Sequence, residues 1–437
     1  MIANPLIFVA TSDFAGKTRG KSFPAVDLEK RLKRGVGWTP TNVQITCFDT
    51  IAESPFGALG DLLLIPAAES EVNIDFDDGS PPERFILGDI HTLEGDPWDF
   101  CTRSILKTAL ARLKNAGGAT LFSTFEHEFQ FKGDAATDNE AYGLGGFSQQ
   151  RIYAETLVAA LEKAGLAPDT FMKEYGPNQY EVTIGPDRGV RSADAAVILR
   201  ELARATARRL SEEITFTPIR DVASVGNGVH IHMSFLNEEG APLTYDADGP
   251  CGMSALTGSF AAGVLKYIDC IVALTAPSAI SYQRLTPHRW SAAYNNLGFR
   301  DREASLRICP VTASDPASIA RQFNIEFRAA DAAASPHLAL AAIIHAGTQG
   351  IEDNLPAPDV TEEDLSLLSA EALKAKGYIR LPQSLEEALE RMNANATVCG
   401  WFPKDFASVY SAHKYGELAY LKDLSIEEQC AAYERTY

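Results

Sequence analysis

The chain has 437 residues, which is enough for two or three domains with a large hydrophobic core. Hydrophobic residues make up 46% and charged residues 22%, as in ordinary soluble proteins, and no apolar run reaches the ~18 residues that cross a bilayer. The 39 Lys and Arg against 58 Asp and Glu give a net charge of −19, which disfavours nucleic acid as a partner.

The N-terminal residues lack the basic segment and the long apolar run of a secretory signal, so we expect a cytoplasmic protein with no membrane partner. The seven cysteines are scattered and form no C-x-x-C pair, which fits neither a disulfide framework nor a zinc ribbon. We therefore expect reduced cysteines. The acidity has two explanations, which are solubility and carboxylates that gather around divalent cations.

The first hundred residues predict a small strand-rich domain. Gly, Pro and Asp clusters separate the short apolar stretches LIFVA, NVQITCF, DLLLIP and RFILGDI. From Ser104 the apolar residues take helical spacing up to Gly117. We place a domain boundary here, with an N-terminal domain at 1–102 and a second domain at 103–437.

The second domain predicts helices and strands in irregular alternation, which indicates an α+β fold rather than a doubly wound sheet. The expected helices are 148–165, 192–211, 252–274, 335–348, 384–393 and 424–436. The expected strands lie around 120–131, 178–184, 229–236 and 304–308. The segment 352–377, rich in Pro, Asp and Glu, predicts a surface excursion.

Two segments look like phosphate-binding loops but lack the required spacing. The sequence AGKT at 15–18 resembles the end of a P-loop, yet Thr11 stands where the first glycine is needed. The sequence GLGG at 143–146 lacks the G-x-G-x-x-G spacing. We expect neither segment to form the corresponding loop.

Acidic residues recur on short predicted strands of the second domain. In FEHEF at 125–129, a strand would project Glu126 and Glu128 from the same face. By itself this is an amphipathic surface strand. The sequence EYGPNQYE adds Glu174 and Glu181, and Glu326 lies two places before an arginine.

The segment GNGVHIHMS at 226–234 would place His230 and His232 on one strand face. A single strand histidine is more often a core residue than a ligand. Five carboxylates with a histidine on separate strands, however, favour Mg²⁺ or Mn²⁺ over zinc. The set is large enough for two or more ions, which typically clamp the oxygens of a phosphoryl transfer.

Four arginines lie within 45 residues of one another, and each could form an ordinary surface salt bridge. They are Arg284 in SYQRL, Arg302 and Arg307 in DREASLR, and Arg328. A guanidinium group binds carboxylate or phosphate through two parallel hydrogen bonds. The clustering therefore favours a role with such a substrate.

Over nearly its whole length the chain resembles the glutamine synthetase superfamily. The segments DFAGKTRGK at 13–21 and GDLLLIP at 60–66 are similar to its N-terminal signatures. The motifs E-x-E, E-x-G-P-x-Q-x-E, G-x-G-x-H-x-H-x-S, S-Y-x-R-L, R-x(4)-R and E-x-R are similar to its catalytic motifs, in the same order. The resemblance implies a small N-terminal β-grasp domain, followed by a large catalytic domain with a curved antiparallel sheet flanked by helices.

The resemblance also implies roles for individual residues. The first metal ion would be held by Glu128, Glu174 and Glu181, and the second, facing ATP, by Glu126, His230 and Glu326. The amino-acid substrate would contact Arg284, Gly226 and Asp61. The nucleotide would contact His232 and Ser234, and the transferred phosphoryl group Arg302, Arg307 and Arg328.

In this family ATP phosphorylates the γ-carboxylate of glutamate, and an amine then displaces phosphate to give an amide. Most of the catalysis would come from metal ions and arginines that neutralise charge. The family forms rings, commonly dodecamers of two stacked hexamers. Each active site lies between the N-terminal domain of one subunit and the catalytic domain of its neighbour. We expect this homo-oligomer here.

Two departures from the family pattern concern the amine. Trp290 stands at the flap position where a glutamine synthetase has an acid, and the usual D-G-S-S loop reads Asp49-Thr-Ile-Ala, which keeps the catalytic acid. An apolar, aromatic pocket suits an alkyl-, aryl- or polyamine better than ammonium. The alternative is that Trp290 only packs in a flap whose acid lies elsewhere.

Three further departures concern the acid and ATP, namely Val225 for the usual Asn, Asn324 for an Arg, and SPH at 335–337 for N-P-Y. Glutamate therefore remains a provisional choice. Two other functions stay open, an ammonia-using glutamine synthetase and an inactive ring protein. The inactive form is disfavoured because a structural descendant has no reason to keep costly clustered charge.

Overall fold

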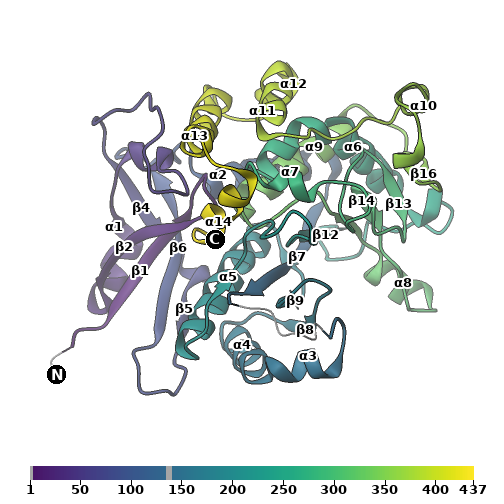
Figure 1. The fold of residues 1–437 in the computed structure, drawn as a ribbon. Coiled ribbons are helices and arrows are strands. Elements are labelled where there is room, and N and C mark those ends of the chain that lie inside the picture. Colours follow the sequence, from purple (N-terminus) through teal and green to yellow (C-terminus); the bar gives the residue numbers. More distant parts are fainter. Residues whose placement is uncertain (1–2, 134–139) are drawn as a thin grey trace.

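The computed structural model describes residues 3–133 and 140–437, which form two β-sheets surrounded by helices (Figure 1). The first sheet uses strands between Leu6 and His91, and the second uses strands from Thr120 onward. This segregation confirms the predicted α+β class. The boundary between residues 102 and 103 stays a prediction.

The first sheet has the strand order β2-β1-β6-β4-β3, with β5 paired to β6. Its strands are β1 (Leu6–Ser12), β2 (Thr18–Pro24), β3 (Val36–Trp38), β4 (Leu62–Pro66), β5 (Val72–Ile74) and β6 (Glu83–His91). The pair β1–β6 is parallel, and the other pairs are antiparallel. Side chains of this sheet and of α1 (Leu28–Arg34) form a small core of their own.

One predicted strand of this region is wrong. Most of NVQITCF is not extended, because Pro40–Gln44 forms a 3₁₀ helix, η2, and only Ile45 makes an isolated bridge, to Ile51. Pro40 sits at the start of η2, where its fixed φ and missing N–H are tolerated. The buried Gln44 side chain donates to the carbonyl oxygen of Val409 at 3.1 Å, a distant contact that local pattern does not reveal.

The second sheet has the strand order β16-β13-β14-β15-β12-β7-β9-β8, and β10 and β11 also pair with β7. Its strands are β7 (Thr120–Phe131), β8 (Pro168–Lys173), β9 (Gln179–Ile184), β10 (Asp187–Arg188), β11 (Ile214–Thr215), β12 (Val229–Leu236), β13 (Leu297–Phe299), β14 (Leu306–Ile308), β15 (Ile325–Phe327) and β16 (Val360–Thr361). The sheet is antiparallel from β14 to β8, while β13 runs parallel to β14 and β16. The strand β16 lies within the predicted surface excursion, which therefore also adds an edge to the sheet.

Helices surround this sheet, and every predicted helix overlaps one of them. They are α2 (Thr102–Gly117), α3 (Leu144–Gln149), α4 (Arg151–Lys163), α5 (Val190–Arg209), α6 (Ala255–Thr275), α7 (Ser281–Arg284), α8 (Pro316–Gln322), α9 (Pro336–Glu352), α10 (Ala370–Ala375), α11 (Leu385–Ala394), α12 (Ala396–Gly400), α13 (Phe406–Leu421) and α14 (Ile426–Glu434). The long helix α13 was not predicted. Its buried side includes His413, Lys414 and Glu417, and these polar residues obscure the apolar periodicity.

Helix α6 is long and apolar enough to cross a membrane by length and composition. Within the fold, however, 67% of its most apolar window is buried. It packs closely on α9, since a Cβ atom on Gly263 would lie 2.8 Å from the Cα atom of Gly350. Its position in the core accounts for its apolar character.

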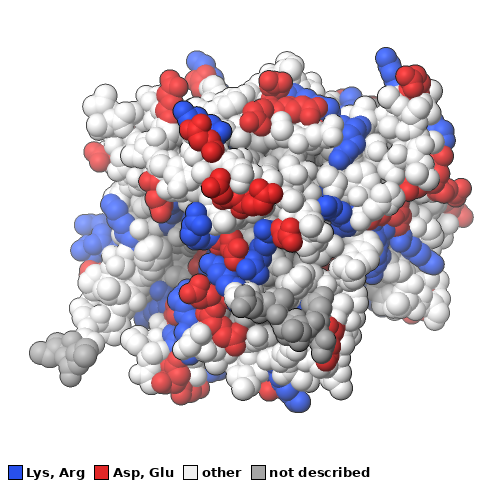
Figure 2. Space-filling model, viewed as in Figure 1, with Lys and Arg blue, Asp and Glu red and all other residues white. Residues whose placement is uncertain are grey.

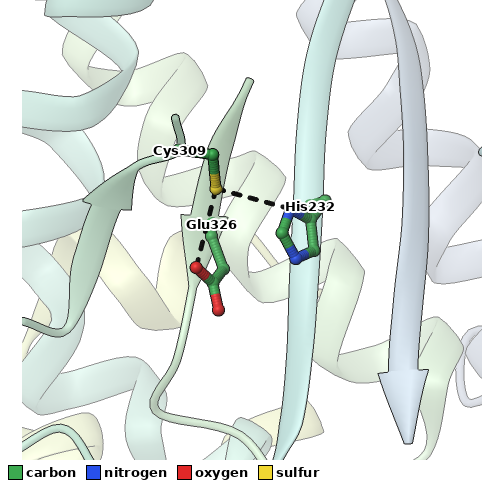
Figure 3. Close-up of side chains that lie close together, drawn as sticks. All are labelled: His232, Cys309 and Glu326. Atoms are coloured by element: carbon green, nitrogen blue, oxygen red, sulfur yellow. Dashed lines mark hydrogen bonds between the residues drawn. The ribbon is translucent and has the colours of Figure 1, made fainter. Parts of the chain in front are cut away.

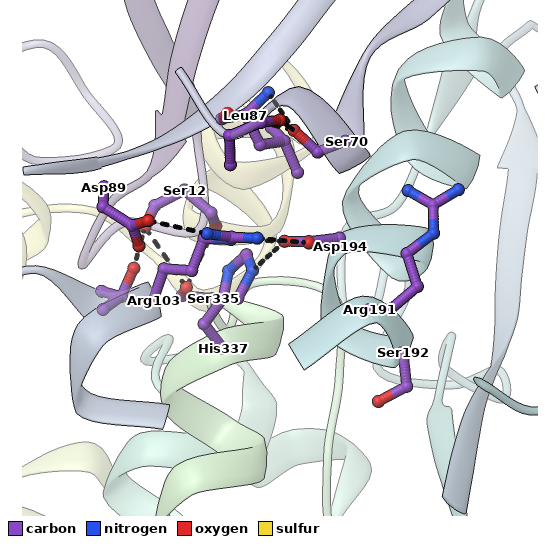
Figure 4. Close-up of polar contacts among 12 residues, drawn as sticks. Ser12, Ser70, Leu87, Asp89, Arg103, Arg191, Ser192, Asp194, Ser335 and His337 are labelled. Carbon is purple, nitrogen blue, oxygen red and sulfur yellow. Dashed lines mark hydrogen bonds and ion pairs between the residues drawn. The ribbon is translucent and has the colours of Figure 1, made fainter. Parts of the chain in front are cut away.

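A buried ionic cluster connects the first sheet to the helices of the second part (Figure 4). Arg103, at the start of α2, pairs with Asp89 on β6 at 2.8 Å and with Asp194 on α5 at 3.0 Å. His337, at the start of α9, lies 2.8 Å from the same Asp194 carboxylate. Because buried charges are costly unless they are paired, the cluster fixes β6, α2, α5 and α9 relative to one another.

Basic and acidic side chains lie next to one another on the face shown in Figure 2. This intermixing agrees with the many ion pairs along the chain, such as Arg209 with Asp78 at 2.8 Å and Arg112 with Glu352 at 2.5 Å. The basic groups on this face do not form a continuous stripe of the kind that follows a nucleic-acid backbone.

Candidate active site

The strand register brings the predicted acids together on one face of the second sheet. Glu126 on β7 lies opposite His230 on β12, and Glu128 lies opposite Glu181 on β9. Glu326 on β15 lies opposite His232, two residues along β12. Side chains alternate along a strand, so the intervening residues pack into the core while these face outward together.

Glu126, Glu181 and His230 form a compact group whose ligand atoms all lie within 4.8 Å of one another. The Nδ1 atom of His230 lies 3.4 Å from Glu126 Oε2 and 3.5 Å from Glu326 Oε1. Carboxylate oxygens with one imidazole fit Mg²⁺ or Mn²⁺. Four of the six predicted ligands are therefore close enough to act together.

The other two predicted ligands are oriented by backbone groups and tyrosines. Glu128 Oε2 accepts a hydrogen bond from the Gly228 N–H at 2.7 Å. Glu174 Oε2 accepts from the Tyr142 hydroxyl at 3.0 Å and from the Tyr175 N–H at 2.9 Å. Sequence reasoning missed both tyrosines, although Tyr175 lies inside the E-x-G-P-x-Q-x-E motif.

Negative charge is poorly balanced on the β9 side of this face. Burial and the nearby Glu126 and Glu128 raise the pKa of Glu181 to about 9. Burial and Glu128 also raise the pKa of Glu174. A divalent cation between these carboxylates would remove the repulsion.

The β15 side carries its own cations. Burial would raise the pKa of Glu326, but Arg328 and His230 lower it to about 2. Arg328 Nη1 makes a short ion pair with Glu326 Oε1, and Arg307 Nη1 lies 2.8 Å from Glu326 Oε2. Two of the four predicted arginines thus lie at the carboxylate face.

Arg284 is buried beside these groups and donates to the Arg328 carbonyl oxygen at 3.2 Å. Its Nη1 has no hydrogen-bond partner among the described residues. Gly226 and Gly228 leave room for it, because a Cβ atom on either would lie within 3.0 Å of the Arg284 side chain. Arg302 is exposed and lies near Tyr142. Burial raises the pKa of the Tyr142 hydroxyl to about 12, and the charge of Arg302 partly opposes this rise.

The two residues predicted to contact the nucleotide lie on the same strand as His230. His232 Nε2 lies 3.0 Å from Glu126 Oε1, and its Nδ1 lies 2.9 Å from Asn324 Oδ1. Ser234 is half-buried and donates to the Phe122 carbonyl oxygen at 3.3 Å. His232 therefore belongs to the carboxylate cluster itself.

We call the segment 288–290 the flap. Polar contacts to its backbone hold it beside the carboxylate face. The Trp290 N–H donates to Glu303 Oε1 at 2.6 Å, and its carbonyl oxygen accepts from Arg328 Nη2 at 3.1 Å. The ring meets Tyr175 edge to face, with centroids 4.8 Å apart, and remains 47% exposed. An aromatic side chain thus stands at the predicted flap position.

Sequence reasoning missed Glu303, which binds the flap backbone at two points. Its Oε2 accepts from the His288 N–H at 3.0 Å, in addition to the contact with Trp290. Burial raises the pKa of this carboxyl, against the effect of those two hydrogen bonds. Glu303 lies inside the R-x(4)-R motif, and this position could have indicated that it lies near the site.

Asp49 and Asp61 lie on the N-terminal part of the chain. Asp49 is exposed and pairs with Arg19 at 2.8 Å, and Asp61 is exposed directly after Gly60, whose φ is 94°. No contact among the described residues joins either acid to the carboxylate face of the same chain. Of the sixteen predicted site residues, the structure thus brings fourteen to that face or its flap, and it leaves these two apart.

Two family models match the chain. The glutamine synthetase N-terminal domain matches residues 3–98, and the glutamine synthetase catalytic domain matches residues 99–433.

Curated relatives extend over almost the whole chain. A γ-glutamylpolyamine synthetase, GlnA3, from Streptomyces coelicolor is 31% identical over 444 residues, covering 99% of this chain and 93% of that protein. Type-1 glutamine synthetase 1 from Dictyostelium discoideum is 30% identical over 452 residues, covering 97% and 88%.

Solved structures agree with the sequence relatives. A crystal structure of a novel glutamine synthase homolog superposes with a TM-score of 0.91 at 38% identity, covering 100% of this chain and 99% of that one. An ADP complex of GmaS superposes with a TM-score of 0.82 at 24% identity, covering 98% and 96%, which is a likeness of fold.

Proposed function

The chain belongs to the glutamine synthetase family of ligases, and from this premise we propose that it joins glutamate to an organic amine at the expense of ATP. The products would be a γ-glutamyl amide, ADP and phosphate. The observation that carries the proposal is the aromatic flap, in which the half-exposed indole of Trp290 packs on Tyr175 beside Glu174.

We propose that Mg²⁺ or Mn²⁺ ions bind in two groups. The first group is Glu128, Glu174 and Glu181, and the second is Glu126, His230 and Glu326. The ions would supply charge neutralisation for the phosphates of ATP. The donor set and the raised pKa of Glu181, caused by burial and neighbouring carboxylates, support this assignment.

The arginines would hold the two anionic substrates. The free Nη1 of buried Arg284 would bind the α-carboxylate of glutamate, with Gly226 leaving the space for it. Arg302, Arg307 and Arg328 would bind the phosphoryl group and the acyl phosphate. His232 and Ser234 would contact the nucleotide from β12. Such preorganised donors stabilise the charge that develops during transfer.

The amine would enter at the flap. A cavity of about 420 Å³ adjoins the flap residue His288, and five carboxylates line it: Asp301, Glu303, Glu362, Glu363 and Asp364. An acidic cavity, one of whose carboxylates, Glu303, binds the Trp290 backbone, favours an amine that carries a second positive charge, as a polyamine does. The relative at 31% identity that is named a γ-glutamylpolyamine synthetase supports the same choice.

Ammonia is the second candidate, and Glu303 favours it. This carboxylate is bound to the flap backbone, so the flap carries an acid although Trp290 occupies the expected position. An acid at the flap could bind ammonium and accept its proton.

Asp49 and Asp61 would complete the site of a neighbouring subunit. They lie on the N-terminal part of the chain, away from the carboxylate face, and both are exposed. A ring in which one subunit's N-terminal domain meets its neighbour's catalytic domain would supply them in trans. We propose a dodecamer of two hexameric rings on this basis.

The test is a panel of amines with glutamate and Mg-ATP, followed by phosphate release and by mass spectrometry of the product. Ammonia, a monoalkylamine, an arylamine and a linear polyamine are compared by kcat/KM. We expect an organic amine to exceed ammonia and to give the mass of its γ-glutamyl amide. A higher kcat/KM for ammonia would contradict the proposal, and no product with any amine would favour an inactive ring protein.

A further inference from the structure

A second group of potential metal ligands lies beside the proposed Mg²⁺ or Mn²⁺ ligands and includes a cysteine. Cys309 directly follows β14, and its Sγ lies 3.6 Å from His232 Nδ1 and 3.6 Å from Glu326 Oε2 (Figure 3). The three ligand atoms all lie within 4.8 Å of one another. Cys309 is 6% exposed and Glu326 is 1% exposed, so the group is sheltered from solvent.

The chemistry of this group differs from that of the neighbouring carboxylates. Mg²⁺ and Mn²⁺ prefer oxygen ligands, whereas a thiolate with an imidazole and a carboxylate suits Zn²⁺ and related cations. Cys309 Sγ faces His232 and Glu326 and has no contact with Glu126 or Glu181 among the described residues. It therefore adds a soft ligand on one side of the cluster only.

The surroundings of His232 suit metal binding through Nδ1. Its Nε2 faces Glu126 Oε1 at 3.0 Å, and a carboxylate beside the second nitrogen of a ligating imidazole orients the ring. A cation on Nδ1 would displace the present contact with Asn324 Oδ1 at 2.9 Å. The thiol proton of Cys309 would leave to solvent on coordination.

We propose that Cys309 Sγ, His232 Nδ1 and Glu326 Oε2 bind one thiophilic divalent cation of the zinc class. This cation inhibits the ligase. It competes with Arg307, which lies 2.8 Å from the same Glu326 oxygen, and it immobilises His232. The site shares the Glu326 side chain with the second group proposed for Mg²⁺ or Mn²⁺, but it uses Oε2, whereas Oε1 lies 3.5 Å from His230 Nδ1.

The direct test uses Co²⁺ as a spectroscopic substitute, added to the full-length protein in excess Mg²⁺. One equivalent should produce a near-ultraviolet thiolate-to-cobalt charge-transfer band. The band should be lost in Cys309→Ser and in Cys309→Ala. It should persist in Cys251→Ser, which removes the exposed cysteine. No band in the unaltered protein, or an undiminished band in both Cys309 variants, would overturn the proposal, whatever the ligase activity is.

The second test measures inhibition by Zn²⁺ at saturating Mg²⁺. Cys309→Ser should keep the uninhibited rate, and its inhibition constant for Zn²⁺ should rise by about tenfold or more, the usual cost of disturbing a metal's surroundings. Equal inhibition of both proteins would place Zn²⁺ on the Mg²⁺ or Mn²⁺ ligands instead. That result would contradict an inhibitory role for Cys309.

Discussion

The carboxylate face has two halves whose negative charge is balanced differently. We call Glu128, Glu174 and Glu181 the acidic half, because burial and mutual repulsion raise the pKa of Glu174 and Glu181. We call Glu126 and Glu326, with their cations, the paired half. There, burial would raise each pKa, but His232 and Arg328 hold the carboxylates ionised.

The difference shows what each half requires. The paired half is preorganised by the chain's own cations and needs no metal ion to stay charged. The acidic half gathers charge that the chain does not compensate, so the proposed divalent ion would be needed to balance it. The flap contacts both halves, since Trp290 touches Tyr175, next to Glu174, and Arg328.

Breaking the paired half should have the largest effect. Arg328→Ala leaves the buried Glu326 carboxylate without its short ion pair, and such a loss costs about 3–5 kcal/mol of stability. The rate of ATP-dependent amide formation should fall by about 10²-fold or more. Denaturant unfolding and steady-state kinetics measure the two effects. Arg321→Ala, which removes an exposed arginine on α8, should change neither, and equal losses in both variants would contradict the assignment.

Removing charge from the acidic half should stabilise the metal-free protein at high pH, whereas Arg328→Ala should destabilise the protein. Glu181 has a raised pKa in the folded state, about 9 through burial and nearby carboxylates, and therefore binds a proton that the unfolded chain has released. Without metal ions, stability should fall as pH rises from the unfolded pKa towards 9, by up to about 1.4 kcal/mol per pH unit.

Glu181→Gln should flatten this pH dependence, and Mg²⁺ should flatten it in the unaltered protein. Thermal unfolding at pH 6 and pH 8, with a chelator or with Mg²⁺, measures both effects. The exposed Glu29→Gln serves as the control and should keep the full pH dependence. If the stability of the protein with chelator does not change between pH 6 and pH 8, the proposed difference between the two halves is contradicted.

The flap can be tested without disturbing either half. Trp290→Ala should raise KM for an organic amine by about 10- to 200-fold, the range for losing apolar contact in a pocket. The KM values for glutamate and ATP should change little. Phe299→Ala is a matched control, because that aromatic residue is 44% exposed on the nearby strand β13. Unchanged amine kinetics would mean that Trp290 is only a packing residue.

The smallest effect is expected for Glu303→Gln, which removes the charge but keeps oxygen and nitrogen atoms near the flap amides. For an organic amine we expect a change of only a few fold in kcat. A loss of about 10²-fold would instead identify Glu303 as a general base and favour ammonia as the acceptor. The comparison is made with each variant's best amine.

The sequence predicted most of the carboxylate face because strand alternation is a local property. Glu126 and Glu128 share a face for this reason, and so do His230 and His232. The register between strands is not local, so the sequence alone did not show that Glu126 faces His230. The position of His232 between Glu126 and Asn324 depends on this register.

The errors and omissions also arise from contacts between distant segments. NVQITCF was predicted as a strand, yet Gln44 reaches α13, a helix whose buried Lys414 and Glu417 hid its periodicity. Glu303 and Tyr142 were missed because they act on backbone and side chains far along the chain. Roles for Asp49 and Asp61 came from resemblance alone, and one chain does not bring them to the site.

The ionic cluster around Arg103 limits how this protein can be divided. Arg103 lies one residue beyond the predicted boundary, while its partner Asp89 belongs to the first sheet. A fragment that began at residue 103 would expose this end of α2 and remove Glu69 and Asp89, two of the carboxylates that pair with the guanidinium. We therefore expect the two parts to be produced and studied only as one chain, even though each has its own sheet.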